Sequence, residues 1–261
     1  MRVAGIEVGR IGLGTNRLTR TPANVAFVKA AVAAGLRFID TAHLYTGGQS
    51  EETVAAALAP FPDHVVVATK GGFGGAGRGR PEVLIAEIEE SLRRLKTDTI
   101  ALYYLHRVDP TTPIEESLGA IKAFQQRGHI RHIGISEVTV DQIERARRLV
   151  EVAAVQNQYN LAERTYDAVV DYCEAQGIVF VPFFPLRGDA PAKVAEIARS
   201  HHASAQQVML AWLLRRSTAM LPIPGTLSLE HLKENLAAER IELSEAELTS
   251  LSQGPGTPGA R

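Results

Sequence analysis

The clearest indication of the fold comes from residues Thr99–Ser136, TIALYYLHRVDPTTPIEESLGAIKAFQQRGHIRHIGIS. Two apolar runs, residues 99–106 and 130–136, flank a segment whose apolar residues recur with a period of about 3.6, as in an amphipathic helix. The first run is continuously apolar from Ile100 to Leu105 rather than alternating, which is typical of strands covered on both faces of a parallel sheet. A helix that joins two such strands implies parallel pairing with a right-handed crossover.

The same strand–helix rhythm extends over the rest of the chain. Apolar runs that precede a helical segment lie at residues 8–15, 36–42, 64–70, 99–106, 130–136, 152–160, 178–186 and 219–225. Eight such units without a change of composition favour a closed (β/α)₈ TIM barrel over an open, doubly wound sheet. We expect one domain over residues 1–261.

Segments outside these units, and residues at helix ends, refine the prediction. Residues 2–9 predict an N-terminal β-hairpin at the bottom of the barrel, residues 204–216 an extra helix before the eighth strand, and residues 253–261 a disordered tail. Pro22 suits a first helical turn, Gly35 a C-terminal cap and Ser50 an N-cap.

Composition argues against several classes of partner. With 28 Lys and Arg against 29 Asp and Glu, the net charge of −1 gives no reason to expect nucleic acid or an anionic membrane. The single cysteine, Cys173, excludes an internal disulfide and suits a reducing compartment. No segment has the ~20 consecutive apolar residues of a membrane-spanning helix. We therefore expect a cytoplasmic protein that acts on a small molecule. Because nothing in the sequence resembles a dedicated interface, we expect a monomer.

Polar side chains follow the ends of the strands, where the active sites of such barrels lie. Asp40 ends the second run, Tyr45 follows in its loop, Lys70 ends the third run and His106 the fourth. An ammonium paired with a carboxylate should lower the pKa of a neighbouring phenol from its usual ~10. Such a phenol can protonate a carbonyl oxygen that the imidazole orients, while a hydride from a cofactor attacks the carbon. Farther round the rim, the runs end at Ser136, at Gln156 and Asn157, and near Phe183.

Other chemistries suit these residues less well. The set lacks the paired nucleophile and base of acyl transfer and the two close carboxylates of glycoside hydrolysis. His129 and His132 straddle a helix end and a strand start, and residues 201–202 lie on a helix, so we expect no metal site. A barrel isomerase that uses Lys70 and His106, without a nicotinamide, stays open.

Gly72, Gly74 and Gly77 have the G-x-G-x-x-G spacing of a dinucleotide-binding turn. In that fold the glycines lead directly into a helix of the first strand–helix unit. Here residues 78–80 intervene before Pro81 and the unit is the third. A flexible loop over the mouth of the barrel is therefore the better interpretation.

Eight short motifs follow one another along the chain. They are GLGT (12–15), FIDTAHLY (38–45), VATK (67–70), LHRVD (105–109), IRHIGIS (130–136), VQNQYN (155–160), FPL (184–186), and IPGT with EHLKEN (223–226 and 230–235). In order and spacing they resemble the aldo-keto reductase family over nearly the whole chain. The resemblance implies a barrel that binds NADPH in extended form and reduces aldehydes or ketones by hydride transfer. It makes Tyr45 the general acid, Lys70 and Asp40 the pair that tunes it, and His106 the residue that orients the substrate.

The resemblance also implies which residues surround the cofactor. Ser136 and Gln156 would hold the nicotinamide carboxamide, Phe183 would stack on the ring, and residues 184–188 would follow the pyrophosphate. The implied cofactor contacts are Gly14, Thr15, Asp40, Ser136, Gln156, Phe183, Pro185, Leu186, Gly188, Gly225, Thr226, His231, Glu234 and Asn235. The implied substrate pocket is formed by Asn16, Tyr45 and His106.

Several positions depart from the family pattern. Near the expected 2′-phosphate, Gly225 and His231 replace the Lys and Arg of many members, which removes the strong guanidinium contact. Thr226 and Lys233 offer compensating contacts, so we expect NADPH ahead of NADH, with NADH possible. Glu137 stands where many members have an asparagine, and a carboxylate there can accept the N–H of the carboxamide but not donate.

The substrate pocket is expected to be open and shallow. Asn16 replaces an aromatic residue of some relatives, the loop at residues 107–113 is short, and the chain ends soon after its last helix. These features predict broad acceptance of aldehydes and ketones.

A second class of function is a nicotinamide-binding regulatory or redox-sensing barrel with little turnover. Such a protein would be expected to carry an interaction extension or an exposed apolar patch, and the sequence indicates neither. Carbonyl reduction is the favoured prediction.

Overall fold

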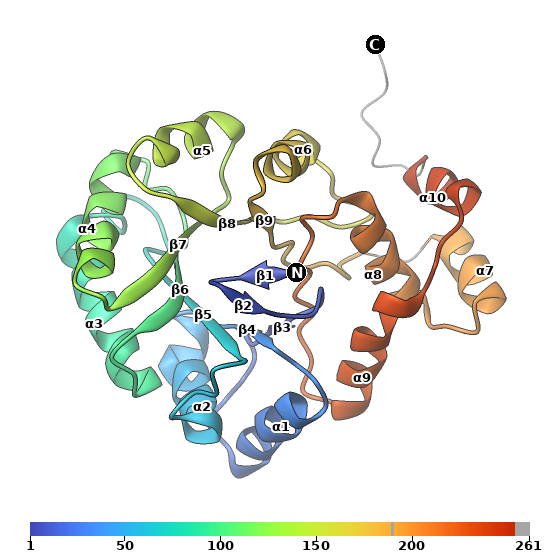
Figure 1. Ribbon diagram of the computed structural model, residues 1–261, viewed down its shortest axis with the longest axis horizontal. Helices are drawn as coiled ribbons and strands as arrows, with labels where there is room; N and C mark the ends of the chain where they lie inside the picture. Colours follow the sequence, from blue (N-terminus) through green and yellow to red (C-terminus); the bar gives the residue numbers. More distant parts are fainter. Residues whose placement is uncertain (189–190, 254–261) are drawn as a thin grey trace.

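The computed structural model describes residues 1–188 and 191–253. Its main sheet has seven strands, paired in parallel and in chain order. They are β3 (Leu13–Gly14), β4 (Phe38–Asp40), β5 (Val66–Gly71), β6 (Ile100–Leu105), β7 (Ile130–Ser136), β8 (Val152–Gln156) and β9 (Val179–Phe180). In Figure 1 the sheet curls round a central axis and the helices lie outside it, so the predicted (β/α)₈ barrel is confirmed.

Residues 219–225 close the barrel between β9 and β3. Bridges join Phe180 to Met220 and Gly14 to Gly225, and Gly12 N donates to the carbonyl of Pro222 at 2.9 Å. We predict the eighth strand at this segment, but the segment does not form a regular strand, because Pro222 and Pro224 have no N–H to continue the ladder. A Cβ on Gly14 would lie only 2.8 Å from the carbonyl oxygen of Ile223, so this close approach requires glycine.

The α-helices cover the outside of the sheet (Figure 1). They are α1 (Pro22–Ala33), α2 (Gln49–Leu58), α3 (Pro81–Leu95), α4 (Ile114–Gln126), α5 (Val140–Arg147), α6 (Asp167–Gln176), α7 (Ala192–Ser200), α8 (Ala205–Arg216), α9 (Leu229–Ala237) and α10 (Glu245–Ser252), with 3₁₀ turns η1 (Tyr45–Gly48) and η2 (Ala238–Arg240). Helix α8 is the predicted extra helix. No helix within the described residues is long and apolar enough to cross a membrane.

The chain ends and helix caps agree with the sequence in most places. Strands β1 (Arg2–Val3) and β2 (Ile6–Glu7) form the predicted antiparallel hairpin. Pro22 opens α1 behind the capping Thr21, and Gly35 follows it with a positive φ of 107°. Residues 254–261 of the predicted tail lie outside the described residues.

The N-cap prediction at Ser50 is wrong. Gly48 occupies the N-cap position of α2, so Ser50 lies inside the first turn. Its buried hydroxyl instead meets Thr41 at 2.7 Å and Thr15 at 2.8 Å. These bonds tie the start of α2 to the ends of β3 and β4.

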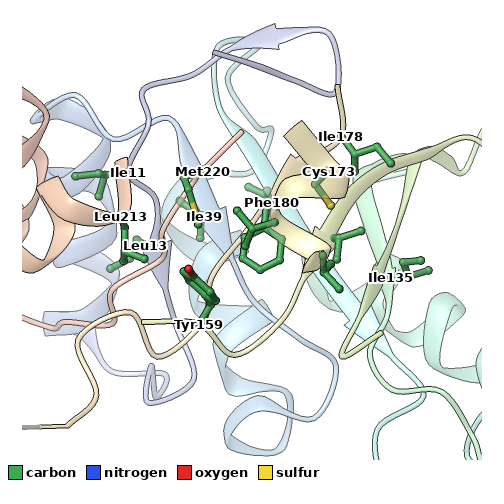
Figure 2. Packing of buried hydrophobic residues seen from close by; sticks show 14 of the residues in the cluster. Ile11, Leu13, Ile39, Ile135, Tyr159, Cys173, Ile178, Phe180, Leu213 and Met220 are labelled. Carbon is green, nitrogen blue, oxygen red and sulfur yellow. The ribbon is translucent and has the colours of Figure 1, made fainter. Parts of the chain in front are cut away.

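Two apolar layers enclose the strands. The outer layer lies between sheet and helices, and Figure 2 shows part of it, with Ile39, Ile135 and Phe180. The inner layer fills the barrel and includes Phe38 and Tyr104. Burial on both faces explains why the strands are continuously apolar.

Candidate active site

Strand alternation places the polar residues at one end of the barrel interior. Side chains of a strand point alternately to its two faces. Phe38, Ala68, Leu102 and Ala154 belong to the inner layer, so the residues that follow them at even spacing point inward as well. Asp40, Lys70, His106 and Gln156 stand in this phase at the carboxyl ends of their strands, and Ser136 follows Ile135, which faces the outer layer.

Asp40 and Lys70 form a fully buried ion pair. The Lys70 ammonium lies 2.5 Å from Oδ1 of Asp40 and donates to the Thr41 carbonyl at 2.7 Å. The amide of Gln156 donates to the other carboxylate oxygen, Oδ2, at 2.8 Å. Burial lowers the pKa of Lys70, but Asp40 and Tyr45 outweigh it and raise that pKa above its usual value. Burial also raises the pKa of Asp40, against the opposing effect of Lys70 and Gln156. The lysine is thus held charged by a carboxylate whose two oxygens are both occupied.

Tyr45 lies beside this pair in η1. The Lys70 ammonium is 5.0 Å from the centre of its ring. Burial raises the pKa of the phenol, and the positive charge of Lys70 lowers it by less, so the net direction is upward. The prediction of a lowered pKa is therefore wrong in sign, because it considered the charge of Lys70 and not the burial of the phenol.

His106 faces Tyr45 across the same end of the barrel. The two ring centres are 6.0 Å apart with planes at 79°, and Phe73 packs on the other side of the imidazole with ring centres 4.7 Å apart. Burial, with the charges of Lys70 and Arg107, holds the pKa of His106 well below its usual value. The imidazole is therefore neutral at physiological pH and can offer an N–H without carrying charge.

A cavity of about 260 Å³ opens over these residues. It is lined by Gly14, Thr15, Asn16, Asp40, Leu44, Tyr45, Phe73, His106, Arg107, Ser136, Gln156, Phe183, Phe184, Pro185, Ile223 and Gly225. The structure thus brings together the predicted proton donor, the residues assigned to the nicotinamide ring and carboxamide, and the three residues of the predicted substrate pocket. Lys70 lies beneath this cavity with no exposed surface.

A second cavity of about 590 Å³ shares Gly225 with the first. It is lined by Arg17, Leu186, Gln206, Gly225, Thr226, Leu227, Ser228, His231, Glu234 and Asn235. Five of the residues predicted for the adenosine end, Gly225, Thr226, His231, Glu234 and Asn235, therefore gather there. Gly188 and Lys233 line neither cavity; in α9, Lys233 is rotated by about 200° from His231, which lies two residues before it.

Two arginines in these cavities were not predicted. Arg17 lies in the adenosine-side cavity and donates to the Gly225 carbonyl at 3.3 Å. Arg107 lies in the first cavity and follows His106 in the LHRVD motif. Both stand just beyond strand ends, where alternation no longer predicts the direction of a side chain. The signal in the sequence was only that Arg17 lies three residues after Gly14 and Arg107 one residue after His106.

Glu137 points elsewhere than its place in the sequence suggested. Its Oε1 accepts the backbone N–H of Gln158 at 2.6 Å, and it does not line the first cavity. The carboxylate is thus committed to the turn after β8, which accounts for an acidic residue at this position without a contact to a carboxamide.

The glycine-rich loop borders the mouth of the barrel. Gly72, Gly74 and Gly77 all have positive φ, and Phe73 between them lines the first cavity. The Gly72 N–H donates to Glu87 of α3 at 2.6 Å. The loop therefore positions an aromatic side chain over the site, as expected for a mouth loop. Within residues 1–188 and 191–253, no group of three His, Cys, Asp or Glu side chains could hold a metal ion.

Known proteins resemble the chain over almost its full length. The model of the aldo/keto reductase family matches residues 10–192 and 188–253. Pyridoxine 4-dehydrogenase of Escherichia coli is 38% identical over 245 residues, which are 87% of this chain and 85% of that protein. A thermostable aldo-keto reductase in complex with the inhibitor epalrestat has a TM-score of 0.88 at 31% identity, covering 97% and 98% of the two chains. An aldo-keto reductase from Klebsiella pneumoniae in complex with NADPH has a TM-score of 0.85 at 29% identity, covering 94% and 90%.

Proposed function

Because the chain belongs to the aldo/keto reductase family of oxidoreductases, we propose that it is an NADPH-dependent reductase that converts aldehydes and ketones to alcohols. The observation that carries the proposal is the buried Lys70–Asp40 pair beside Tyr45, on the same rim as a neutral His106. This set provides one proton donor, one fixed positive charge next to it and one uncharged hydrogen-bonding ring. Such a combination suits protonation of a carbonyl oxygen coupled to hydride attack on its carbon.

Tyr45 is proposed to give its phenolic proton to the carbonyl oxygen. Its raised pKa keeps the phenol protonated at neutral pH. The phenolate left behind forms next to the Lys70 ammonium, whose charge stabilises it. Asp40 keeps that ammonium charged and in place, and Gln156 fixes the carboxylate.

His106 is proposed to orient the carbonyl group. Its ring lines the first cavity opposite Tyr45 and is packed against Phe73. Because the imidazole is neutral, it can hydrogen-bond the carbonyl oxygen without competing with Tyr45 as a proton source.

The two cavities fit a nicotinamide dinucleotide. The first offers Phe183 as an aromatic face and the polar groups of Ser136 and Gln156, and the second offers Arg17 and His231 beside the N-terminus of α9. The guanidinium of Arg17 and backbone N–H groups at a helix start are suited to phosphate. When bound, a reduced nicotinamide supplies a hydride. The NADPH complex of the Klebsiella pneumoniae relative supports this choice of cofactor.

Cofactor titration followed by turnover tests the proposal. NADPH and NADH are titrated by fluorescence, and aldehydes, including pyridoxal in view of the Escherichia coli relative, are then screened for oxidation of the tighter cofactor. We expect tighter NADPH binding and repeated turnover. A single oxidation event per protein molecule would favour a redox-sensing barrel instead, and failure to bind either cofactor would favour the isomerase. We also propose that the chain works as one domain and as a monomer.

A further inference from the structure

Arg107 is a fixed guanidinium in the wall of the first cavity. It lies between two aromatic rings, 5.5 Å from the centre of Phe73 and 5.5 Å from that of Phe183. Its Nη1 donates to the His106 carbonyl at 3.2 Å and to the Ser136 hydroxyl at 3.3 Å. Aromatic faces and two hydrogen bonds therefore hold the planar group without neutralising its charge.

Most of its donors stay available. A guanidinium has five N–H donors. The two hydrogen bonds that Arg107 makes within the described part of the chain both use Nη1. Within residues 1–188 and 191–253, no carboxylate forms an ion pair with Arg107, whereas Arg78 and Arg94 are both paired with glutamates.

The first cavity consequently has an excess of positive charge. Its only lining carboxylate, among the described residues, is that of Asp40, and the Lys70 ammonium beneath already pairs with it. The positive charge of Arg107 acts on His106 and Tyr45: it lowers the pKa of His106 and opposes the rise in the pKa of Tyr45. Three exposed apolar side chains also line the cavity: Leu44, Phe73 and Phe184 are 40%, 43% and 42% exposed.

We propose that the preferred substrates are carbonyl compounds that carry a carboxylate on an apolar or aromatic body, and that Arg107 binds the carboxylate. The apolar rim contacts the body, while the free edge of the guanidinium accepts the anion in the two-pronged geometry that carboxylates favour. This inference rests on the proposed reductase function and specifies its substrate class. It gives Arg107 the role of a specificity-determining residue.

Two aldehydes that differ in having a para carboxylate or its uncharged methyl ester test the inference. 4-Carboxybenzaldehyde and methyl 4-formylbenzoate share ring and aldehyde, and their kcat/KM values are measured with saturating NADPH. We expect the wild type to prefer the acid, and Arg107→Gln to lower the acid-to-ester ratio at least tenfold, mainly through KM. Arg107→Lys should keep part of the ratio because it keeps the charge. The preference should also shrink as the salt concentration rises from 50 to 500 mM, because the Debye screening length falls from ~14 to ~4 Å.

Arg80→Gln is the matched control. Arg80 is exposed on the same loop as Phe73 and lines neither cavity. Its replacement by Gln changes the net charge by the same amount as Arg107→Gln, but removes no charge from the site. It should leave the acid-to-ester ratio unchanged within about twofold. If Arg107→Gln does not fold, Arg107→Lys and the salt dependence of the wild type decide.

The outcomes separate the two proposals. Reduction of neither aldehyde by the wild type would refute the reductase function itself. Reduction of both, with a ratio that Arg107→Gln does not change, would overturn only the role of Arg107. A tenfold loss of NADPH affinity in Arg107→Gln with an unchanged ratio would instead assign the arginine to the cofactor, and would also overturn the inference.

Discussion

The Lys70 ammonium lies 2.5 Å from Oδ1 of Asp40, and neither side chain is more than 1% exposed. An isolated charge at such depth is strongly unfavourable, so each member of the pair makes the other possible. Each member of the pair also has a second hydrogen bond: the Lys70 ammonium donates to the Thr41 carbonyl, and the Asp40 carboxylate accepts from the Gln156 amide. The ammonium is therefore a permanent positive charge 5.0 Å from the centre of the Tyr45 ring.

Removal of one partner should destabilise the protein more than removal of both. Asp40→Leu leaves the Lys70 ammonium buried and uncompensated, which should lower the free energy of unfolding by about 3–5 kcal/mol. Asp40→Leu combined with Lys70→Met replaces the pair by apolar groups and should recover most of this loss. Urea denaturation measures both effects. A single variant as stable as the wild type would show that the pair is not a buried ion pair in solution.

The double variant also separates stability from chemistry. It should be well folded but reduce aldehydes poorly, because the phenolate of Tyr45 would form without a neighbouring positive charge. Full activity in this stable variant would remove the ion pair from the mechanism.

The pH profile of reduction should be flat across the neutral range. Tyr45 must be protonated, and its pKa is raised above the usual ~10, so activity should fall only as pH rises past about 10. His106 must be neutral, and its pKa lies well below the usual ~6.5, so activity should not fall as pH decreases to about 6. The measurement is kcat/KM from pH 6 to 10.5 at constant ionic strength. A limb near pH 7 that disappears in His106→Gln would contradict the neutral imidazole.

Much of this site was predictable because strand alternation carries over to strand ends. Asp40, Lys70 and His106 share their phase with the apolar residues that fill the barrel, so their spacing in the sequence predicts that they point into the same interior. The direction of the shift in the pKa of Tyr45 was not predictable, since burial of the phenol depends on tertiary packing that strand alternation does not describe. The place of the eighth segment in the barrel was predicted correctly, but its regular strand was not found. Pro222 and Pro224 were the signal in the sequence against a regular strand, and our prediction did not use it.

His231→Arg should increase the preference for NADPH over NADH. His231 lines the second cavity at the start of α9, and a guanidinium there would add a charge-assisted contact to the 2′-phosphate. We expect the ratio of the two dissociation constants, measured by fluorescence titration, to shift about tenfold, which corresponds to about 1.4 kcal/mol. If the ratio does not move, another group recognises the phosphate.

Arg17→Gln should have the opposite effect. Arg17 supplies a guanidinium to the same cavity and is anchored to the Gly225 carbonyl. Its loss should weaken NADPH binding by about tenfold and NADH binding much less, because charged hydrogen bonds contribute ~1.5–3 kcal/mol. Arg20→Gln is the control, since Arg20 pairs with Glu52 and lines neither of the two cavities. Equal weakening of both cofactors in Arg17→Gln would place the arginine at the pyrophosphate or ribose.

The most direct test of the account is the turnover of Tyr45→Phe, measured together with its NADPH dissociation constant. Removal of the hydroxyl takes away the proton donor and leaves the Lys70–Asp40 pair and the cavity walls in place. We expect a turnover at least ~10²-fold lower, the usual scale for loss of a general acid, with a nearly unchanged NADPH dissociation constant. Wild-type turnover in this variant would contradict the role of Tyr45, and with it the proposed mechanism.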